Sequence, residues 1–273
     1  MINKKIIYIS GLPFAGGSIL AQLFSQHPDI FSIGETSALC STLIGLRQQL
    51  SDNHILLNQL ERNFHLTYQR ILNANWGLIN GWFKETSKPW VVDQNSDWLR
   101  HIETLYTLDS DFKMLICVRE LGQILGEIEN QHQKTILLDF PEHTAHLPRR
   151  ERANQGFGEN GLLGESMRSL LNIQDIDPAL HDHLYYVVYE HLISDPEQVM
   201  TQIWQWLGLP SVKLDLELFP VSEKSTSSHR FKYPQQNLYN SEASNVYPIS
   251  ASLDQALKQT YFWFYKTFYP AKA

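Results

Sequence analysis

Charge and cysteine are both scarce in this sequence. Charged residues make up 19% of the 273 positions, and 22 basic against 29 acidic side chains give a formal net charge of −7. That balance argues against a nucleic-acid-binding surface, although a local basic pocket is compatible with it. The two cysteines, Cys40 and Cys117, make no disulfide framework, which suits a reducing compartment. Cys117 lies in the apolar run KMLICV and is expected to be a buried thiol.

Long apolar runs are also missing. The apolar run near the start has only four residues before Ser10, whereas a signal peptide needs about 7–15. No stretch approaches the roughly 18 apolar residues of a membrane span. We therefore expect no membrane association and a location in the cytoplasm of a bacterium.

Four short apolar runs are typical of buried parallel strands, because each is rich in valine, isoleucine or tyrosine. They cover residues 6–10, 90–93, 114–118 and 184–189. Each is followed by a helical pattern, and strands that alternate with helices favour a parallel sheet. The sequence thus predicts one α/β domain over residues 1–273, with a P-loop-type three-layer fold whose central parallel sheet is flanked by helices.

Other segments are predicted from helical spacing or from the lack of it. Residues 54–83 are predicted to form one long helical stretch, and residues 253–268 a final aromatic helix. Scattered charge and glycine indicate a lid loop at 134–158. The Ser-, Asn- and Gln-rich segment 219–248 is predicted to be a flexible loop.

The stretch YISGLPFAGGSIL has the outline of a phosphate-binding loop. Gly11-x-x-x-x-Gly16-Gly17-Ser18 fits the spacing of a Walker A loop, with Gly17 in place of lysine. Glycines let backbone N–H groups point at one anion, and the following helix offers its positive dipole end. Without the lysine, a nucleotide triphosphatase is a poor interpretation. A plain strand-to-helix turn is the alternative.

Four segments, in order along the chain, resemble sulfotransferases that use 3′-phosphoadenosine 5′-phosphosulfate (PAPS). They are ISGLPFAGGSILAQLFSQHPDI, VVDQNSDWLRHIETL, LICVRE and YYVVYEHLISDPEQVMTQIWQWLGLP. The first matches the family's G-x-P-[RK]-S-G-[ST]-[ST] loop at Gly11, Pro13, Gly16 and Ser18. The resemblance covers roughly residues 5–210 and is nearest in motif to the tyrosylprotein or Golgi type.

This resemblance implies a PAPS donor site. The loop that would hold the donor comprises Gly11, Pro13, Phe14, Ala15, Gly16, Gly17 and Ser18, with backbone amides of 15–18 and the Ser18 hydroxyl on the 5′-phosphate. Arg119 would pair with the 3′-phosphate, and Tyr189 would lie beside the adenosine. Glu35 falls where tyrosylprotein-type members carry a catalytic base. A helix-cap carboxylate is the alternative role for Glu35. The chemistry requires no metal.

The departures from the family pattern all concern charge. The loop's basic residue is Phe14 and its serine is Ala15, while Gln94 stands where some members carry a lysine. Glu127, eight residues after Arg119, replaces a serine on the 3′-phosphate. A carboxylate there would repel the phosphate unless it points away or is neutralised.

Two basic clusters could supply the missing cation. Arg149, Arg150 and Arg152 lie in the predicted lid. His229, Arg230 and Lys232 lie in the predicted flexible loop, and Arg230 and Lys232 are the candidates that the resemblance to cytosolic members implies. Solvated loops are the alternative in both cases.

Three functions remain open at this point. The first is sulfuryl transfer from PAPS to a hydroxyl or amine of a small-molecule acceptor. The second is a binding protein or pseudoenzyme with the same fold, and the third an enzyme for another nucleotide or phosphate ester. A lysine or arginine that contacts residues 14–18 would favour an enzyme. Histidines 143, 146, 181 and 183 lack the spacing of a metal site. The sequence leaves a homo-oligomer open.

Overall fold

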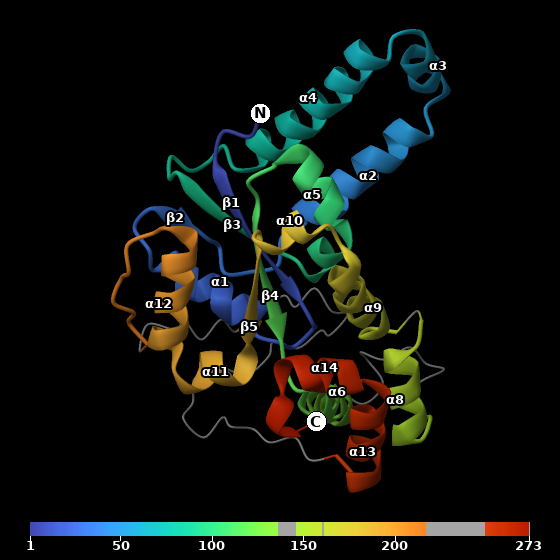
Figure 1. Ribbon diagram of the computed structural model, residues 1–273, viewed down its shortest axis with the longest axis vertical. Helices are drawn as coiled ribbons and strands as arrows, with labels where there is room; N and C mark the ends of the chain where they lie inside the picture. The colour runs from blue at the N-terminus through green and yellow to red at the C-terminus, as the bar shows by residue number, and fades with distance from the viewer. Residues whose placement is uncertain (136–145, 160, 217–248, 273) are drawn as a thin grey trace.

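A central sheet of five parallel strands organises the protein (Figure 1). The computed structural model describes residues 1–135, 146–159, 161–216 and 249–272. The strand order is β2-β3-β1-β4-β5. The strands are β1 (Lys5–Gly11), β2 (Ile30–Phe31), β3 (Trp90–Gln94), β4 (Lys113–Val118) and β5 (Leu184–Val188). All four predicted strands and their parallel pairing are confirmed, and the sequence missed only the two-residue β2.

Helices cover both faces of the sheet (Figure 1). On one face, α1 (Gly17–Ser25) packs against α12 (Pro196–Leu207) through Phe24 and Trp204, whose ring centroids are 4.9 Å apart. The other face carries α5 (Ile102–Leu108) and α9 (Gly164–Asn172). The α/β class and its central parallel sheet, as predicted, are therefore confirmed.

The remaining elements connect these layers. They are α6 (Leu121–Thr135), α8 (Arg149–Phe157), α10 (Pro178–His181), α11 (Tyr189–Ser194), α13 (Ala251–Thr260), α14 (Phe262–Phe268), and the 3-10 helices η1 (Ser96–His101), η2 (Ile173–Asp175) and η3 (Pro270–Lys272). Among the described residues, no helix combines the length and apolarity that a membrane span needs. Cys117 is buried, as predicted, and burial raises the pKa of its thiol to about 12.

The predicted long helix at 54–83 is two helices that belong to a projecting arm. We call α2 (Leu39–Ser51), α3 (His54–Arg62) and α4 (Phe64–Trp82) the helical arm. Asn63 separates α3 from α4, because its backbone is not helical (φ −149°, ψ 79°) and its side-chain oxygen accepts a hydrogen bond from the Leu66 N–H. In Figure 1 the arm leaves the body of the molecule, and α3 forms its tip. The final helix at 253–268 is likewise divided, at Tyr261.

The predicted lid loop is wrong where the structure describes it. Residues up to Thr135 belong to α6, and residues 149–157 form α8. The arginines that suggested a loop stabilise a helix instead, since Arg152 Nε donates to Glu129 Oε1 of α6 at 2.9 Å. The part at 136–145, and all of the predicted flexible loop at 219–248, lie outside the described residues.

Candidate functional site

The loop between β1 and α1 is fixed to the end of β4. The Leu12 N–H donates to the Cys117 carbonyl at 2.9 Å. Gly11 has φ +124°, and a Cβ atom on it would lie 2.1 Å from the Cys117 oxygen. No other residue fits so close to a neighbouring backbone, which explains the glycine that begins the motif.

The same loop turns sharply before α1. Phe14 and Gly16 both adopt left-handed backbone conformations, with φ +59° and +87°. Gly16 is the N-cap of α1, no side chain caps the helix, and its first turn carries no acidic residue. The first N–H groups of a helix have no intrahelical acceptor, so those of Gly17 and Ser18 are open to an anion. The predicted loop residues thus form one tight turn between the carboxyl end of β1 and the start of α1.

Arg119 contacts this turn from the end of β4. Its Nη1 donates to the Phe14 carbonyl oxygen at 2.8 Å and forms an ion pair with Glu127 of α6. The guanidinium carbon lies 4.1 Å from the centroid of the Tyr189 ring. Only 4% of the Arg119 side chain is exposed. The structure therefore brings together Phe14, Arg119, Glu127 and Tyr189, and the carboxylate of Glu127 is neutralised by the arginine.

Two further carboxylates follow Arg119 and Tyr189 directly in the chain, and neither was predicted as a site residue. Glu120 accepts hydrogen bonds from the Tyr265 hydroxyl at 2.5 Å and from the Gln123 N–H at 2.8 Å. Glu190 accepts from the Tyr269 hydroxyl at 2.7 Å. Burial, followed by the neighbouring carboxylate, holds the pKa of each tyrosine well above its usual range, so both hydroxyls stay protonated. The dipeptides Arg119-Glu120 and Tyr189-Glu190, each just after a strand, were the available signal.

Gln94, at the end of β3, faces the first turn of α1. Its Oε1 accepts a hydrogen bond from the Thr36 hydroxyl at 2.8 Å. A Cβ atom on Gly17 would lie 3.1 Å from Gln94 Nε2. Because Thr36 occupies the carbonyl end of the side chain, the amide nitrogen is directed towards the loop. Gln94 thus offers a neutral donor where a lysine was missing.

Glu35 is exposed, and the residue after it, Thr36, forms a parallel bridge with Gln94 at the end of β3. The Ser37 N–H donates to the Gln94 carbonyl at 2.8 Å, which fixes this segment beside the loop. The helix that follows begins at Leu39 with Ala38 as its N-cap. The alternative role of Glu35 as a helix cap is therefore wrong. Its role as a base stays a prediction.

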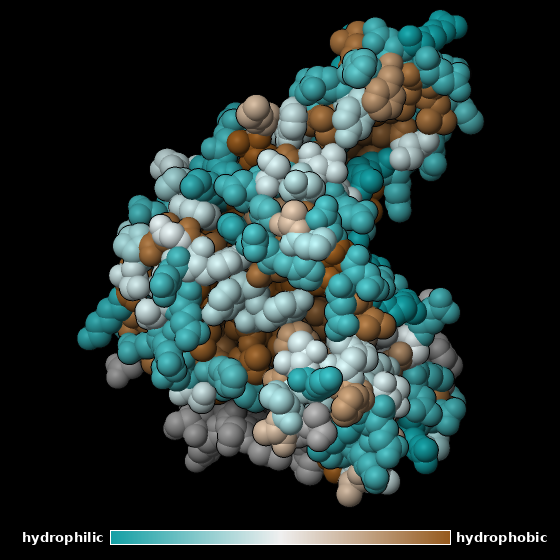
Figure 2. All heavy atoms as spheres, viewed as in Figure 1, coloured by the Kyte–Doolittle hydropathy of each residue, from teal (hydrophilic) through white to brown (hydrophobic). Residues whose placement is uncertain are grey.

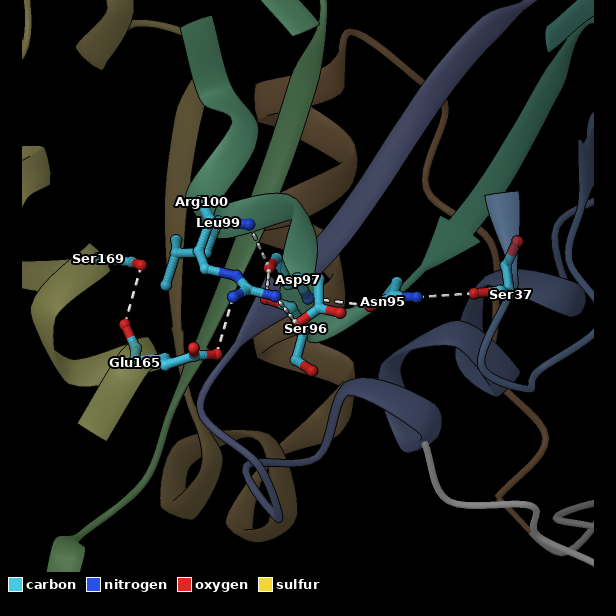
Figure 3. A network of polar contacts seen from close by, with 9 residues as sticks. Ser37, Asn95, Ser96, Asp97, Leu99, Arg100, Glu165 and Ser169 are labelled. Carbon is cyan, nitrogen blue, oxygen red and sulfur yellow. Dashed lines mark hydrogen bonds and ion pairs between the residues drawn. The ribbon is translucent and has the colours of Figure 1, made fainter. Parts of the chain in front are cut away.

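A polar network holds the end of β3 in place (Figure 3). Asn95 Nδ2 donates to the Ser37 carbonyl at 2.7 Å, and Asn95 Oδ1 accepts from the Asp97 N–H at 2.9 Å. Ser10 of β1 donates to the Ser96 carbonyl at 2.7 Å and accepts from the Leu99 N–H at 2.9 Å. These bonds set the position of Gln94 relative to the loop that follows Ser10.

The basic residues that were predicted to replace the missing loop cation are paired elsewhere, exposed, or outside the described residues. Arg152 pairs with Glu129, which raises the pKa of the guanidinium, and Arg149 Nε lies 4.0 Å from the same carboxylate. Arg150 is exposed. His229, Arg230 and Lys232 lie outside the described residues. Arg119 is a cation that does contact residues 14–18, through its hydrogen bond to the Phe14 carbonyl. The described part of the chain holds no group of three metal-ligating side chains.

A family model described as the sulfotransferase family matches residues 7–213. The chain belongs to this family. No protein of curated function matches it significantly.

Solved sulfotransferases share the fold. A sulfotransferase domain from the curacin biosynthetic pathway superposes with a TM-score of 0.53 at 16% identity, covering 96% of this chain and 99% of that one. The sulfotransferase domain of the Synechococcus PCC 7002 olefin synthase gives the same score and identity, with 96% of both chains covered. A sulfotransferase from Alicyclobacillus acidocaldarius gives 0.52 at 15%, with 96% and 91% covered. These likenesses confirm the fold expected from the resemblance.

Proposed function

We propose that this chain transfers a sulfuryl group from PAPS to a hydroxyl or amine of a small-molecule acceptor, in the cytoplasm. One observation carries the proposal. At the end of the loop of residues 11–18, two consecutive backbone N–H groups at the start of α1 have no side-chain cap and no acidic residue beside them. The Arg119 guanidinium donates a hydrogen bond to the same loop, at the Phe14 carbonyl. Such a start attracts anions.

In this proposal each residue has a defined task. The amides of Gly17 and Ser18 bind the 5′-phosphosulfate. The acceptor atom attacks sulfur, the bond from sulfur to the bridging oxygen breaks, and negative charge grows on that oxygen. Gln94 Nε2, directed at the same turn, donates to the charge that develops there. Glu35 takes the proton that the acceptor loses. Arg119 and Tyr189 receive the nucleoside end of the donor.

A second candidate is a sulfotransferase-fold protein that binds another donor or does not turn PAPS over. The carboxylate on Arg119 favours it. Glu127 pairs with the arginine, and Glu120 and Glu190, which follow Arg119 and Tyr189 in the chain, bind the hydroxyls of Tyr265 and Tyr269. A 3′-phosphate at Arg119 would therefore meet negative charge as well as positive.

Calorimetric titration with adenosine 3′,5′-bisphosphate tests the proposal without knowledge of the acceptor. We expect micromolar binding to the unmodified chain and its loss in Gly17→Asp, which places a carboxylate in the first turn of α1. Gly77→Asp is the matched control, because Gly77 is also helical and has open space around it. Absence of binding at millimolar nucleotide would remove PAPS and leave the second candidate.

A further inference from the structure

One N–H group of Arg119 is left without an acceptor. Its Nη1 bonds to the Phe14 carbonyl and to Glu127, whereas Nε is buried and has no hydrogen-bond partner in the described part of the chain. Only 4% of the Arg119 side chain is exposed. Burying a donor without an acceptor costs free energy, and native proteins seldom leave one in that state. The Nε–H is therefore available to an oxygen of a bound ligand without the loss of a protein hydrogen bond.

Glu190 lies near this guanidinium but does not pair with it. Its Oε1 accepts a hydrogen bond from the Glu120 N–H, next to Arg119 in the chain, at 3.2 Å. Its Oε2 accepts from the Tyr269 hydroxyl at 2.7 Å. Burial and then Glu190 raise the pKa of Tyr269, whereas Arg119 lowers it, so the guanidinium is within electrostatic range of the same hydroxyl. Within the described residues, Arg119 pairs with Glu127 and not with Glu190.

The C-terminal helices bring the tyrosine hydroxyl to Glu190. Their apolar sides face the body, since Leu257, Phe264 and Tyr265 are buried while the outer surface over α13 is mostly hydrophilic (Figure 2). The Tyr269 N–H donates to the Tyr265 carbonyl at 2.7 Å, so the two side chains lie one helical turn apart on the same side. Both tyrosines are buried, and each hydroxyl ends on a carboxylate of the body.

We propose that Tyr269 is a positioning residue of the anion site. Its hydroxyl holds the Glu190 carboxylate away from Arg119, so that the guanidinium keeps its Nε–H for an oxygen of the donor nucleotide. This inference rests on the proposed function, because it assigns a supporting residue to the same donor site. Without the hydroxyl, Glu190 Oε2 loses its donor, and the nearby guanidinium is the charge that attracts it.

Tyr265 provides an internal comparison. Its hydroxyl also donates to a carboxylate, that of Glu120, but Glu120 accepts from two backbone N–H groups in the first turn of α6 as well, at 3.1 and 2.8 Å. Removing the Tyr265 hydroxyl therefore leaves the Glu120 carboxylate in place. Removing the Tyr269 hydroxyl leaves Glu190, among the described residues, with the longer bond from the Glu120 N–H.

Calorimetric titration with adenosine 3′,5′-bisphosphate tests the assignment. Tyr269→Phe should weaken binding about tenfold, the effect of losing a hydrogen bond to a charged group. Tyr265→Phe should weaken it less. When Glu190→Gln is added to Tyr269→Phe, the charge that competes for Arg119 is gone, and affinity should return to at least that of the unmodified chain. A defect of packing alone would not be repaired by this second change.

Tyr185→Phe is the matched control. The Tyr185 hydroxyl donates to the neutral Gln202 amide oxygen at 3.3 Å, so this variant also loses a tyrosine hydrogen bond but none to a carboxylate. Its nucleotide affinity should equal that of the unmodified chain. Urea unfolding of every variant measures the accompanying change in stability.

The Nε–H signal of Arg119 in nitrogen–proton correlation NMR gives a second readout that needs no nucleotide. The signal is assigned by its absence in Arg119→Lys. We expect it to shift in Tyr269→Phe and to return when Glu190→Gln is added, because the carboxylate then no longer reaches the guanidinium.

The outcomes separate this inference from the proposed function. Equal nucleotide affinity of Tyr269→Phe and the unmodified chain, or a loss that Glu190→Gln does not repair, would overturn the inference alone. An unmodified chain that binds no nucleotide would overturn the proposed function. The NMR signal then decides the inference by itself: a reversible shift supports it, and an unmoved signal in Tyr269→Phe overturns it.

Discussion

The Arg119 guanidinium donates a hydrogen bond to the Phe14 carbonyl at 2.8 Å, although the two residues are 105 positions apart. The same Nη1 pairs with Glu127, and neither side chain of the pair is more than 4% exposed. The donor loop, the end of β4 and α6 are therefore coupled through one buried cation. A change in the charge of any partner should affect both stability and anion binding.

Glu127→Gln should separate these two effects. The change leaves Arg119 without its anion, and breaking a buried pair costs about 3–5 kcal/mol of unfolding free energy, less where glutamine keeps a hydrogen bond. At the same time, affinity for adenosine 3′,5′-bisphosphate should rise about tenfold, because the freed guanidinium can make a charge-assisted bond worth about 1.5–3 kcal/mol. Urea unfolding and calorimetry measure the two quantities.

Glu129→Gln is the control for this comparison. Glu129 is 3% exposed and pairs with Arg152, so its loss should also destabilise the protein. It lies away from the loop contact, and nucleotide affinity should not change. An equal gain of affinity in both variants would mean that net charge, and not the Arg119 pair, controls binding.

Gln94→Leu should reduce turnover about 10²–10³-fold, the usual effect of losing one donor to a developing oxyanion. Thr36→Val should reduce it less, because the amide then loses only the bond that orients it. Thr42→Val is a suitable control, since the Thr42 hydroxyl donates to the Ala38 carbonyl of its own helix. Initial rates with a shared acceptor give the ranking. Equal rates for Gln94→Leu and the unmodified chain would remove the amide from the mechanism.

Glu35→Gln should lower turnover by about 10²-fold or more while nucleotide affinity stays the same, as expected for a base that acts only on the acceptor. Glu103→Gln, at an exposed position of α5, controls for the change in surface charge. Initial rates and calorimetric titration with adenosine 3′,5′-bisphosphate measure the two quantities. Full activity of Glu35→Gln would exclude this role.

Asp93 should make the protein less stable as pH rises. Burial raises the pKa of its carboxyl from 3.8 to about 6 in the folded protein. The folded state therefore holds this proton more tightly than the unfolded state, and the contribution of Asp93 to stability is greatest below pH 4. It falls between pH 4 and 6 by up to about 3 kcal/mol, and no further above that range.

Asp93→Asn should remove this fall and raise the unfolding free energy at pH 7.5. Trp98 Nε1 donates to Asp93 Oδ1 at 2.6 Å, and the asparagine oxygen can accept the same bond. Urea unfolding at several pH values measures the effect, with the exposed Asp52→Asn as control. Parallel pH curves for the unmodified chain and Asp93→Asn would contradict the assignment.

The sheet was predictable from sequence, whereas the divisions between helices were not. Strands buried on both faces need continuous apolar runs, and β1, β3, β4 and β5 have them. The two residues of β2 are too few for any pattern. The break at Asn63 depends on its side chain, which caps the start of α4. The helical spacing of apolar residues continues across this position and gives no sign of a break. Local spacing alone contains no such information.

The loop motif was also readable, because a glycine at position 11 and a helix start at 17 are local requirements. The surroundings of Arg119 were not. Glu127 was seen in the sequence as a source of repulsion, yet the way α6 leaves β4 turns it into a partner. Glu120 and Glu190 became visible only when Tyr265 and Tyr269 were placed beside them. Such contacts depend on long-range packing.

The bond between Tyr265 and Glu120 joins residues 145 positions apart, and that between Tyr269 and Glu190 joins residues 79 apart. Contacts between residues so far apart in the chain form slowly, because closing the long loop between them costs chain entropy before the contact stabilises it. The helices, whose hydrogen bonds join neighbouring turns, can therefore form while the surroundings of Arg119 are still open. During refolding, recovery of nucleotide binding should lag behind recovery of secondary structure.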